Sequence, residues 1–195
     1  MIRLGLTGGI GTGKSMVAGI FSHLDIPIFY GDQEAKKAYA DTEILVKVKQ
    51  SFGNTVFENN RVNYKKLADM VFTQPEMLQK LNSIIHPFLI RQFEKWTEQQ
   101  HRAPYVIMEA AILFEASLQH FFDVTVAVSA PRELCIERVM NRDCLQGADV
   151  IRRMDNQWPD DQKIALANFV VINDGEHLLI PQVLAIHKSV LNSLK

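Results

Sequence analysis

The sequence predicts an α/β fold with a five-stranded, largely parallel sheet flanked by helices. Five short apolar runs alternate with longer stretches whose apolar residues recur at helical spacing. A glycine-rich run separates the first expected strand from the first expected helix, as at the start of a parallel crossover unit. Such alternation leads to helices packed on the faces of a parallel sheet.

The first crossover unit occupies the N-terminal part of the chain. We expect a strand over residues 2–7, a helix over about 14–24, and a second strand over 28–30, directly after Pro27. The helix is predicted by four apolar residues at helical spacing, namely Val17, Ile20, Phe21 and Leu24.

Residues 33–100 are expected to be mostly helical. Groups of apolar residues at helical spacing predict helices around 45–49, 64–71 and 78–85. Pro87 is expected to begin or kink the next helix, because proline lacks the N–H that a helix interior uses.

Strand signals return further along the chain at 105–108, 124–128 and 169–172. Pro131 and Glu133 suit the first turn of a helix that runs to about Arg142. A polar stretch over 141–163 precedes the last strand, and a C-terminal helix follows that strand.

Composition describes one ordinary soluble domain. The chain has 195 residues, 47% of them hydrophobic and 22% charged, which is enough to bury a core. Its net charge of -1 gives no support to bulk nucleic-acid binding. Cys135 and Cys144 imply no disulfide framework, no apolar run has the length of a membrane span, and the loop at Gly8 begins too early for a signal peptide. We therefore expect a cytoplasmic protein that binds neither nucleic acid nor membrane.

Residues 8–15 fit the phosphate-binding pattern of Gly, four residues, and Gly-Lys-Ser, in the required context between a strand and a helix. Glycines let successive backbone N–H groups point at one anion, and the helix N-terminus adds partial positive charge. Lys14 would place a full charge on the transferred phosphate, and Ser15 would offer its hydroxyl to Mg²⁺. The expected ATP-binding residues here are Gly8, Gly9, Ile10, Gly11, Thr12, Gly13, Lys14, Ser15 and Met16.

Nucleotide binding alone does not separate a kinase from a switch or a motor. A guanine-nucleotide switch needs Asn-Lys-x-Asp and Asp-x-x-Gly, and neither string occurs. The short chain, with helices inserted after the second strand, favours a small-molecule kinase. A kinase for nucleosides or nucleotides and a non-catalytic ATP-binding module remain as alternatives.

Two acidic residues follow expected strands. Asp32 comes after the second strand, and strand carboxyl ends converge on the ligand crevice, so its carboxylate can orient or deprotonate an acceptor hydroxyl. The alternative is a turn residue after Gly31. Glu109 ends the third strand and can hold the hydration shell of Mg²⁺; the alternative is a capped strand end.

Two further features have two interpretations each. Arg138 and Arg142 share one helix face, and with the polar stretch after them they form either a mobile lid over the nucleotide or a solvated helical pair. His86, next to Pro87, is either a functional residue or, as is more usual for a lone histidine, a packed or exposed one.

Several further motifs belong with the phosphate loop. The full set is Leu6-Thr-Gly-Gly-Ile-Gly-Thr-Gly-Lys-Ser15, Leu81-Asn82 with His86-Pro87, Ile112-Leu-Phe-Glu115, Arg138-x-x-x-Arg142-Asp143, Arg153 with Gln157, Lys163, and Asn173-Asp-Gly175. Together these motifs resemble the dephospho-CoA kinase family, which performs the last step of coenzyme A synthesis, and the resemblance covers nearly the whole chain.

The resemblance implies a P-loop NTPase-type sheet with a helical substrate-binding region and a helical lid. The nucleotide-binding core would comprise 1–31, 104–136 and 164–195, the dephospho-CoA region 32–103, and the lid 137–163. It implies ATP-dependent phosphorylation of the ribose 3′-hydroxyl of dephospho-CoA, with Mg²⁺, by a monomer or weak homo-oligomer.

The resemblance also assigns residues. Asp32 aligns with the family's acid near the acceptor hydroxyl, and Arg142 with the lid arginine that approaches ATP, so these two and Lys14 are the expected catalytic residues. The other expected ATP contacts are Arg138, Asn173, Asp174 and Gly175. The other expected substrate contacts are Thr7, Lys36, His86, Pro87, Leu113, Phe114 and Glu115. Ser15 and Glu109 are the expected metal ligands.

The chain departs from the family pattern at several positions. Tyr30 replaces the first acid of an Asp-x-Asp string, so the role of that acid is dispensable here or supplied elsewhere, with Glu109 as the candidate. Ala111 replaces a proline, Asn168 an aspartate, and Met16 a frequent threonine. None of these changes touches the phosphate chemistry directly, so we expect an active enzyme.

Overall fold

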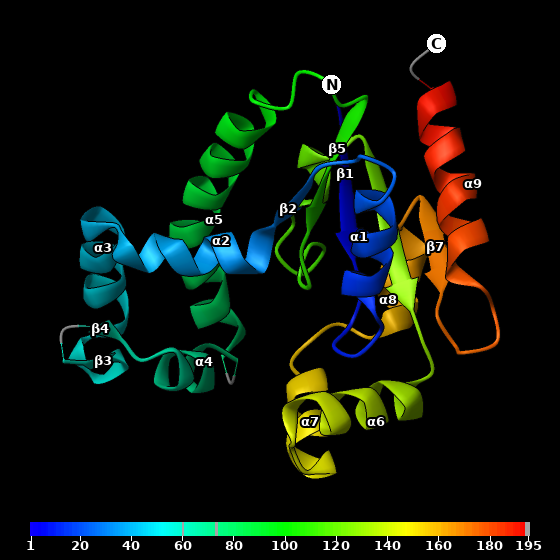
Figure 1. Ribbon diagram of the computed structural model, residues 1–195. Coiled ribbons are helices and arrows are strands. Elements are labelled where there is room, and N and C mark those ends of the chain that lie inside the picture. The colour runs from blue at the N-terminus through cyan, green and yellow to red at the C-terminus, as the bar shows by residue number, and fades with distance from the viewer. Residues whose placement is uncertain (60, 73, 194–195) are drawn as a thin grey trace. The chain divides into compact units, whose positions relative to one another are not determined.

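The computed structural model describes residues 1–59, 61–72 and 74–193 and divides the chain into two compact units (Figure 1). Residues 1–30 and 100–195 form one unit, called the sheet unit below, and residues 31–99 form the other, called the helical unit. Residues 60, 73, 194 and 195, which fall within the expected substrate region and core, lie outside the described residues.

The sheet unit contains the predicted five-stranded parallel sheet, so the expected fold class is confirmed. Its strands are β1 (Ile2–Thr7), β2 (Ile28–Tyr30), β5 (Tyr105–Glu109), β6 (Val124–Ser129) and β7 (Phe169–Ile172), in the order β2-β5-β1-β6-β7. Every neighbouring pair is parallel. β1 is central and mostly buried, as its run of apolar residues predicts.

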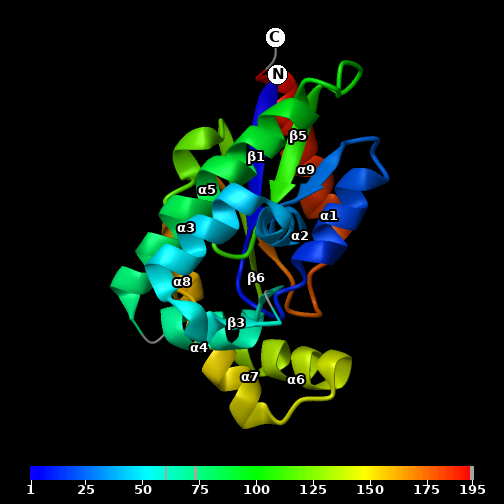
Figure 2. The ribbon, with the colours of Figure 1, turned by 90° about the vertical axis from the view of Figure 1, so that its left-hand side faces the viewer.

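Helices cover both faces of this sheet. α1 (Lys14–Ser22) and α9 (Leu179–Asn192) lie side by side on one face, where Phe21 and Ile186 pack into the same core as Leu6. Figure 2 shows α8 (Asp160–Leu166) on the other side of the sheet from α1 and α9, packed against β6. α6 (Arg132–Asp143) and α7 (Gly147–Met154) pack on each other.

The helical unit has a core of its own. Its helices are α2 (Gly31–Lys37), α3 (Thr42–Phe52), α4 (Tyr64–Phe72) and α5 (Pro75–Thr97), with single 3₁₀ turns at Ala38–Ala40 and Asn54–Val56. Asp41 caps α3 by accepting hydrogen bonds from the backbone N–H groups of Glu43 and Ile44. Ile44, Val48 and Ile85 belong to one buried cluster.

Two features of the helical unit differ from the prediction. Residues 75–97 form one continuous helix, because Pro87 lies on its exposed side while Ile85, Leu89 and Phe93 bury one face at four-residue spacing across it. Burial of that face offsets the single lost hydrogen bond. β3 (Phe57–Glu58) and β4 (Arg61–Val62) form a short antiparallel pair where only helix and loop were expected.

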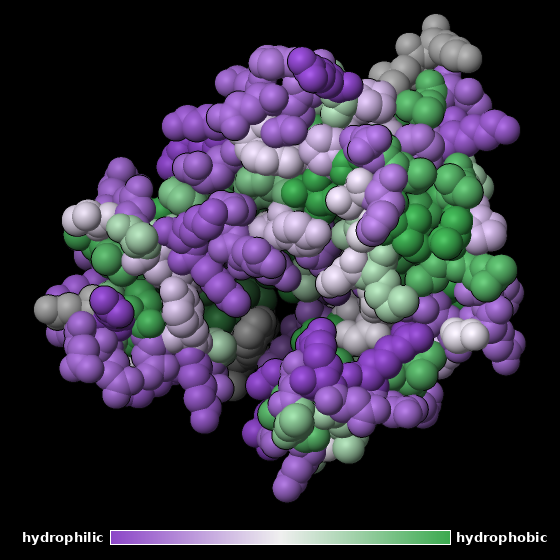
Figure 3. Space-filling view, viewed as in Figure 1, coloured by the Kyte–Doolittle hydropathy of each residue, from purple (hydrophilic) through white to green (hydrophobic). Residues whose placement is uncertain are grey.

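The surface of the sheet unit is uneven in polarity. Figure 3 shows a hydrophobic area over α9, and the exposed apolar residues of that helix include Ile180 and Leu184. Within the described part of the chain, no helix has the length and apolarity that a bilayer span needs.

Candidate active site

The loop between β1 and α1 has the backbone that its glycines permit. Gly8, Gly11 and Gly13 have φ angles of 148°, 84° and 91°, values that side chains disfavour. The loop also packs closely against α6, since a Cβ on Gly11 would lie 2.5 Å from the carbonyl oxygen of Cys135. Neither the turn nor the packing would tolerate a larger residue at these positions.

Gly13 and Asn173 fit together most closely. The buried Asn173 side chain donates a 2.7 Å hydrogen bond from Nδ2 to the carbonyl oxygen of Thr12. A Cβ on Gly13 would stand 2.1 Å from that Nδ2. The segment after β7 therefore supports the phosphate loop directly.

We expect Gly13→Ala to lower the free energy of unfolding by about 2–5 kcal/mol, through left-handed strain plus displacement of Asn173. Gly175→Ala is the matched control, because Gly175 has a φ of 92° against 91° at Gly13 but no atom within 4 Å of an added Cβ. Urea unfolding of both variants measures the difference. Equal losses would show that strain alone acts at Gly13.

Lys14 lies against the loop that it is expected to serve. Its Nζ donates to the carbonyl oxygens of Gly8 and Gly9 at 2.9 and 3.1 Å. Ser15 follows it in the first turn of α1 with an exposed side chain. The ammonium and the hydroxyl thus stand at the helix N-terminus, where phosphate is favoured.

A pocket of about 480 Å³ opens beside the loop. Gly9, Ile10 and Thr12 line it from the loop, and the start of α6 and the segment before α8 line its other walls. Backbone amides and an apolar wall suit a nucleotide better than a fully apolar ligand.

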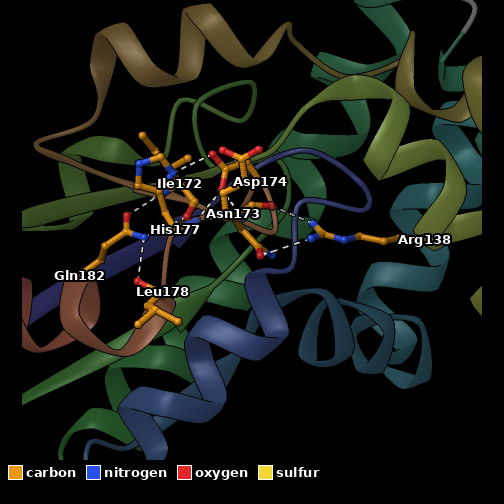
Figure 4. Close-up of polar contacts among 8 residues, drawn as sticks. Arg138, Ile172, Asn173, Asp174, His177, Leu178 and Gln182 are labelled. Carbon is orange, nitrogen blue, oxygen red and sulfur yellow. Dashed lines mark hydrogen bonds and ion pairs between the residues drawn. The ribbon is translucent and has the colours of Figure 1, made fainter.

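Figure 4 shows how the segment after β7 is held. Arg138 of α6 donates to the carbonyl oxygen of Asn173 at 3.1 Å and to its Oδ1 at 3.3 Å. Gln182 of α9 bonds the backbone of Ile172 and the carbonyl oxygen of Leu178. Asn173 and Arg138, both expected to contact ATP, are thus brought together.

Asp174 forms the turn of this segment. It accepts hydrogen bonds from the backbone N–H groups of His177 and Glu176 and pairs with the His177 ring at 2.7 Å. These bonds, the backbone bond from His177 first, lower the pKa of Asp174 to about 2. Asp174 is therefore ionised at neutral pH and fixes the turn that includes Gly175.

The Arg142 side chain is paired with its neighbour in the chain, Asp143. Its guanidinium forms two hydrogen bonds, of 2.7 and 3.0 Å, with the neighbouring Asp143, and its side chain is 66% exposed. The hydrogen bond raises the pKa of Arg142 and lowers that of Asp143. In this structure the expected lid arginine is paired locally.

The carboxyl edge of the sheet holds Glu109 and Thr7. Glu109 ends β5, is 8% exposed, and stands in register with Leu6 on one side and Tyr30 on the other. Glu109 is thus adjacent to the position where the family pattern has its first acid. The buried Thr7 hydroxyl donates to the carbonyl oxygen of Ala111 at 3.3 Å, so its role at this edge includes holding the backbone.

The segment after β5 is packed inward. Leu113 and Phe114 are buried, and the Glu115 side chain is only 6% exposed and paired with Lys163 of α8 at 2.6 Å. Their placement favours support of the site over direct contact with a ligand. Lys163 and Gln157 are residues whose contacts no local pattern predicts. In the sequence, only the family resemblance indicates that these two residues belong to the site.

Four expected site residues lie in the helical unit. Asp32 and Lys36 are exposed and four residues apart on α2, which puts them on one face of that helix. His86 and Pro87 lie within α5. Burial lowers the pKa of His86 to about 4, so its imidazole is neutral at pH 7.

This pKa predicts a pH dependence of stability. Because the unfolded chain binds a proton at His86 near pH 6.5 and the folded chain only near 4, stability is full above about pH 6.5 and falls as the pH drops toward 4. We expect His86→Gln to narrow the gap between the thermal midpoints at pH 7 and pH 5. The same substitution at the exposed His101 is the control, and an unchanged gap in the His86 variant would contradict the burial effect.

The parallel sheet and the glycine loop with Lys14 and Ser15 define a nucleotide-binding protein of the P-loop class. The family model for dephospho-CoA kinase matches residues 2–178. The chain belongs to the dephospho-CoA kinase family.

Individual relatives agree with this assignment. A dephospho-CoA kinase from Bacteroides fragilis is 36% identical over 184 residues, covering 94% of this chain and 90% of the relative. A crystal structure from Thermus thermophilus is 31% identical, with a TM-score of 0.82 over 100% of this chain and 98% of that one. A dephospho-CoA kinase structure from Campylobacter jejuni, 20% identical with a TM-score of 0.63 over 99% and 98% of the two chains, shares the fold.

Proposed function

We propose that the protein transfers the γ-phosphoryl group of ATP to the ribose 3′-hydroxyl of dephospho-CoA, giving coenzyme A and ADP. The observation that carries the proposal is the phosphate loop, with its three positive-φ glycines and the Lys14 ammonium at the N-terminus of α1, in a chain of the dephospho-CoA kinase family. The transfer breaks the bond between the γ-phosphorus and the bridging oxygen and forms one to the acceptor oxygen.

Each part of the chain has a role in the proposal. Residues 1–31, 104–136 and 164–195 hold ATP, 137–163 form the lid, and 32–103 hold the acceptor. The compact unit formed by residues 31–99 supports a separate acceptor-binding region. The backbone amides of the loop hold the phosphates, and the segment Asn173–Gly175 stands beside the adenine.

Three side chains act on the reacting groups. Lys14 moves from the loop carbonyls to the γ-phosphate and neutralises its charge. Arg142 exchanges Asp143 for the phosphates when the lid closes, and Arg138 of the same helix also contacts ATP. Asp32 orients the 3′-hydroxyl and takes its proton.

The donor set at the loop fits Mg²⁺. The Ser15 hydroxyl is exposed at the start of α1, and Glu109 supplies a carboxylate at the end of β5. Mg²⁺ usually keeps several waters and binds through one or two carboxylates plus substrate phosphates, so two protein ligands would be enough to hold it here. When bound, the ion neutralises the charge on the β- and γ-phosphates.

The acceptor is bound by the remaining residues of the proposal. Lys36 lies one helical turn beyond Asp32 and offers a cation for a substrate phosphate. His86 and Pro87 also belong to the dephospho-CoA site. Thr7, Leu113, Phe114 and Glu115 shape that site from the edge of the sheet. We further propose a cytoplasmic monomer or weak homo-oligomer that binds neither nucleic acid nor membrane, in keeping with the net charge of -1.

Release of ADP in a coupled assay tests the function. We expect release only when dephospho-CoA is added with ATP and Mg²⁺. A panel of nucleosides and nucleotides is run in parallel. Release with nucleosides alone would replace the proposed acceptor, and ATP binding without release for any acceptor would indicate a non-catalytic module.

A further inference from the structure

The segment between α7 and α8, residues 155–159 and called the connector below, lies directly on the phosphate loop. The Oε1 of Gln157 accepts a 2.9 Å hydrogen bond from the backbone N–H of Ile10. A Cβ on Gly9 would be 3.4 Å from Oδ1 of Asp160 and 3.8 Å from Oε1 of Gln157. One side-chain amide thus fixes a backbone group of the loop from a segment 147 residues away in sequence.

The connector is itself fastened to the sheet. The backbone N–H of Trp158, next to Gln157, donates to Oε1 of Glu115 at 3.1 Å, and Nζ of Lys163 pairs with the same oxygen at 2.6 Å. Nζ also donates to the carbonyl oxygen of Ala111 at 3.1 Å, which the Thr7 hydroxyl shares. We call the contacts among Trp158, Glu115 and Lys163 the anchor.

The anchor is poorly suited to adding stability alone. The Lys163 and Glu115 side chains are 1% and 6% exposed, so both charges have lost most of their water. Oε2 of Glu115 is buried without a hydrogen-bond partner in the described part of the chain. An apolar pair of similar volume often stabilises at least as well as such a pair. Unlike an apolar pair, Glu115 held by Lys163 provides a fixed acceptor for the Trp158 N–H.

We propose that Gln157 is a positioning residue of the phosphate loop and that the anchor holds it in place. By occupying the Ile10 N–H, Gln157 keeps the loop in its anion-binding curl before a nucleoside triphosphate arrives, so less ordering is needed on binding. The inference rests on the proposed function in one respect, namely that this loop binds the phosphates of ATP.

Calorimetric titration with ATP and Mg²⁺, without acceptor, tests the role of Gln157. We expect Gln157→Leu to weaken ATP binding about 3- to 10-fold, the worth of one hydrogen bond. Asn156→Ala, which removes the neighbouring exposed amide, is the control and is expected to bind normally. Unchanged or tighter binding by Gln157→Leu would overturn the proposal, since tighter binding would mean that Gln157 competes with phosphate.

Two double variants test the anchor without leaving one buried charge unpaired. Glu115→Gln with Lys163→Met removes both charges but keeps an acceptor for the Trp158 N–H. Glu115→Leu with Lys163→Met removes the acceptor too, so we expect the larger loss of ATP affinity there. In that second background, Gln157→Leu is expected to add little. Equal losses in the two double variants, or additive effects, would overturn the anchoring role.

Thermal unfolding midpoints distinguish a positioning role of Gln157 and the anchor from a purely structural role. A purely structural role predicts lower midpoints with unchanged ATP affinity, and that result would overturn the proposal. Lys47→Met is the matched control, because Lys47 pairs with Glu43 at the same 2.6 Å but is 53% exposed. If ATP affinities change as expected but dephospho-CoA is not phosphorylated, the proposed function fails and the positioning role stands.

Discussion

Lys14→Ala is expected to lower turnover by about 10³-fold or more, because it removes the full charge from the transferring phosphoryl group. The variant loses the Lys14 bonds to Gly8 and Gly9, but the loop should keep its shape because its glycines, the Asn173 bond to Thr12 and the Gln157 bond to Ile10 remain. Single-turnover phosphorylation of dephospho-CoA measures the loss.

Two further variants show whether the loss of turnover is specific to the Lys14 ammonium. Lys14→Arg keeps a positive charge in a different shape and should recover only part of the activity, because guanidinium and ammonium groups are not interchangeable. Lys47→Ala removes an exposed lysine from α3 and should leave turnover unchanged. Near-normal turnover of Lys14→Ala would contradict the assignment of the loop.

Asp32→Asn is expected to lower turnover about 10²- to 10⁴-fold, the usual contribution of a general base. The amide keeps the size of the carboxylate but cannot take the proton of the 3′-hydroxyl. ATP binding should not change, because the loop and its supports are intact. Calorimetry with ATP alone and initial rates with dephospho-CoA separate the two effects.

The control for Asp32 lies on the same helix. Glu34→Gln removes a carboxylate that pairs with Lys37 at 2.6 Å on the surface, and such pairs contribute little. Its turnover should match that of the unaltered protein. If Asp32→Asn behaved like Glu34→Gln, the base would have to be another group or none.

The parts of the fold that depend on local sequence were predictable. The glycine loop, α1 and the five strands are set by neighbouring residues, through φ angles that glycine permits and through apolar runs. Pro87 shows the limit of such rules, since α5 continues through it because burial on either side outweighs one hydrogen bond. A proline signal is local, whereas that burial depends on tertiary packing.

The candidate site was predicted unevenly for the same reason. The role expected of Lys14 follows from its place in a local pattern. The Lys163 contact with Ala111 spans 52 residues and the Asn173 contact with Thr12 spans 161. No periodic pattern in the sequence predicts either contact. Glu115, Gln157 and Lys163 were visible only as members of a family pattern. Their contacts required the structure.

The position of the transferred phosphate distinguishes the proposed reaction from phosphorylation of any other hydroxyl. Phosphorus–proton correlation NMR of the product from ATP, Mg²⁺ and dephospho-CoA identifies the ribose proton coupled to the new phosphate, and so separates a 3′-phosphomonoester from a 2′ one. We expect one new 3′-phosphomonoester, formed in step with ADP and strongly reduced with the Lys14→Ala variant. ADP formed without this product, or a phosphate at another position, would contradict the proposed function.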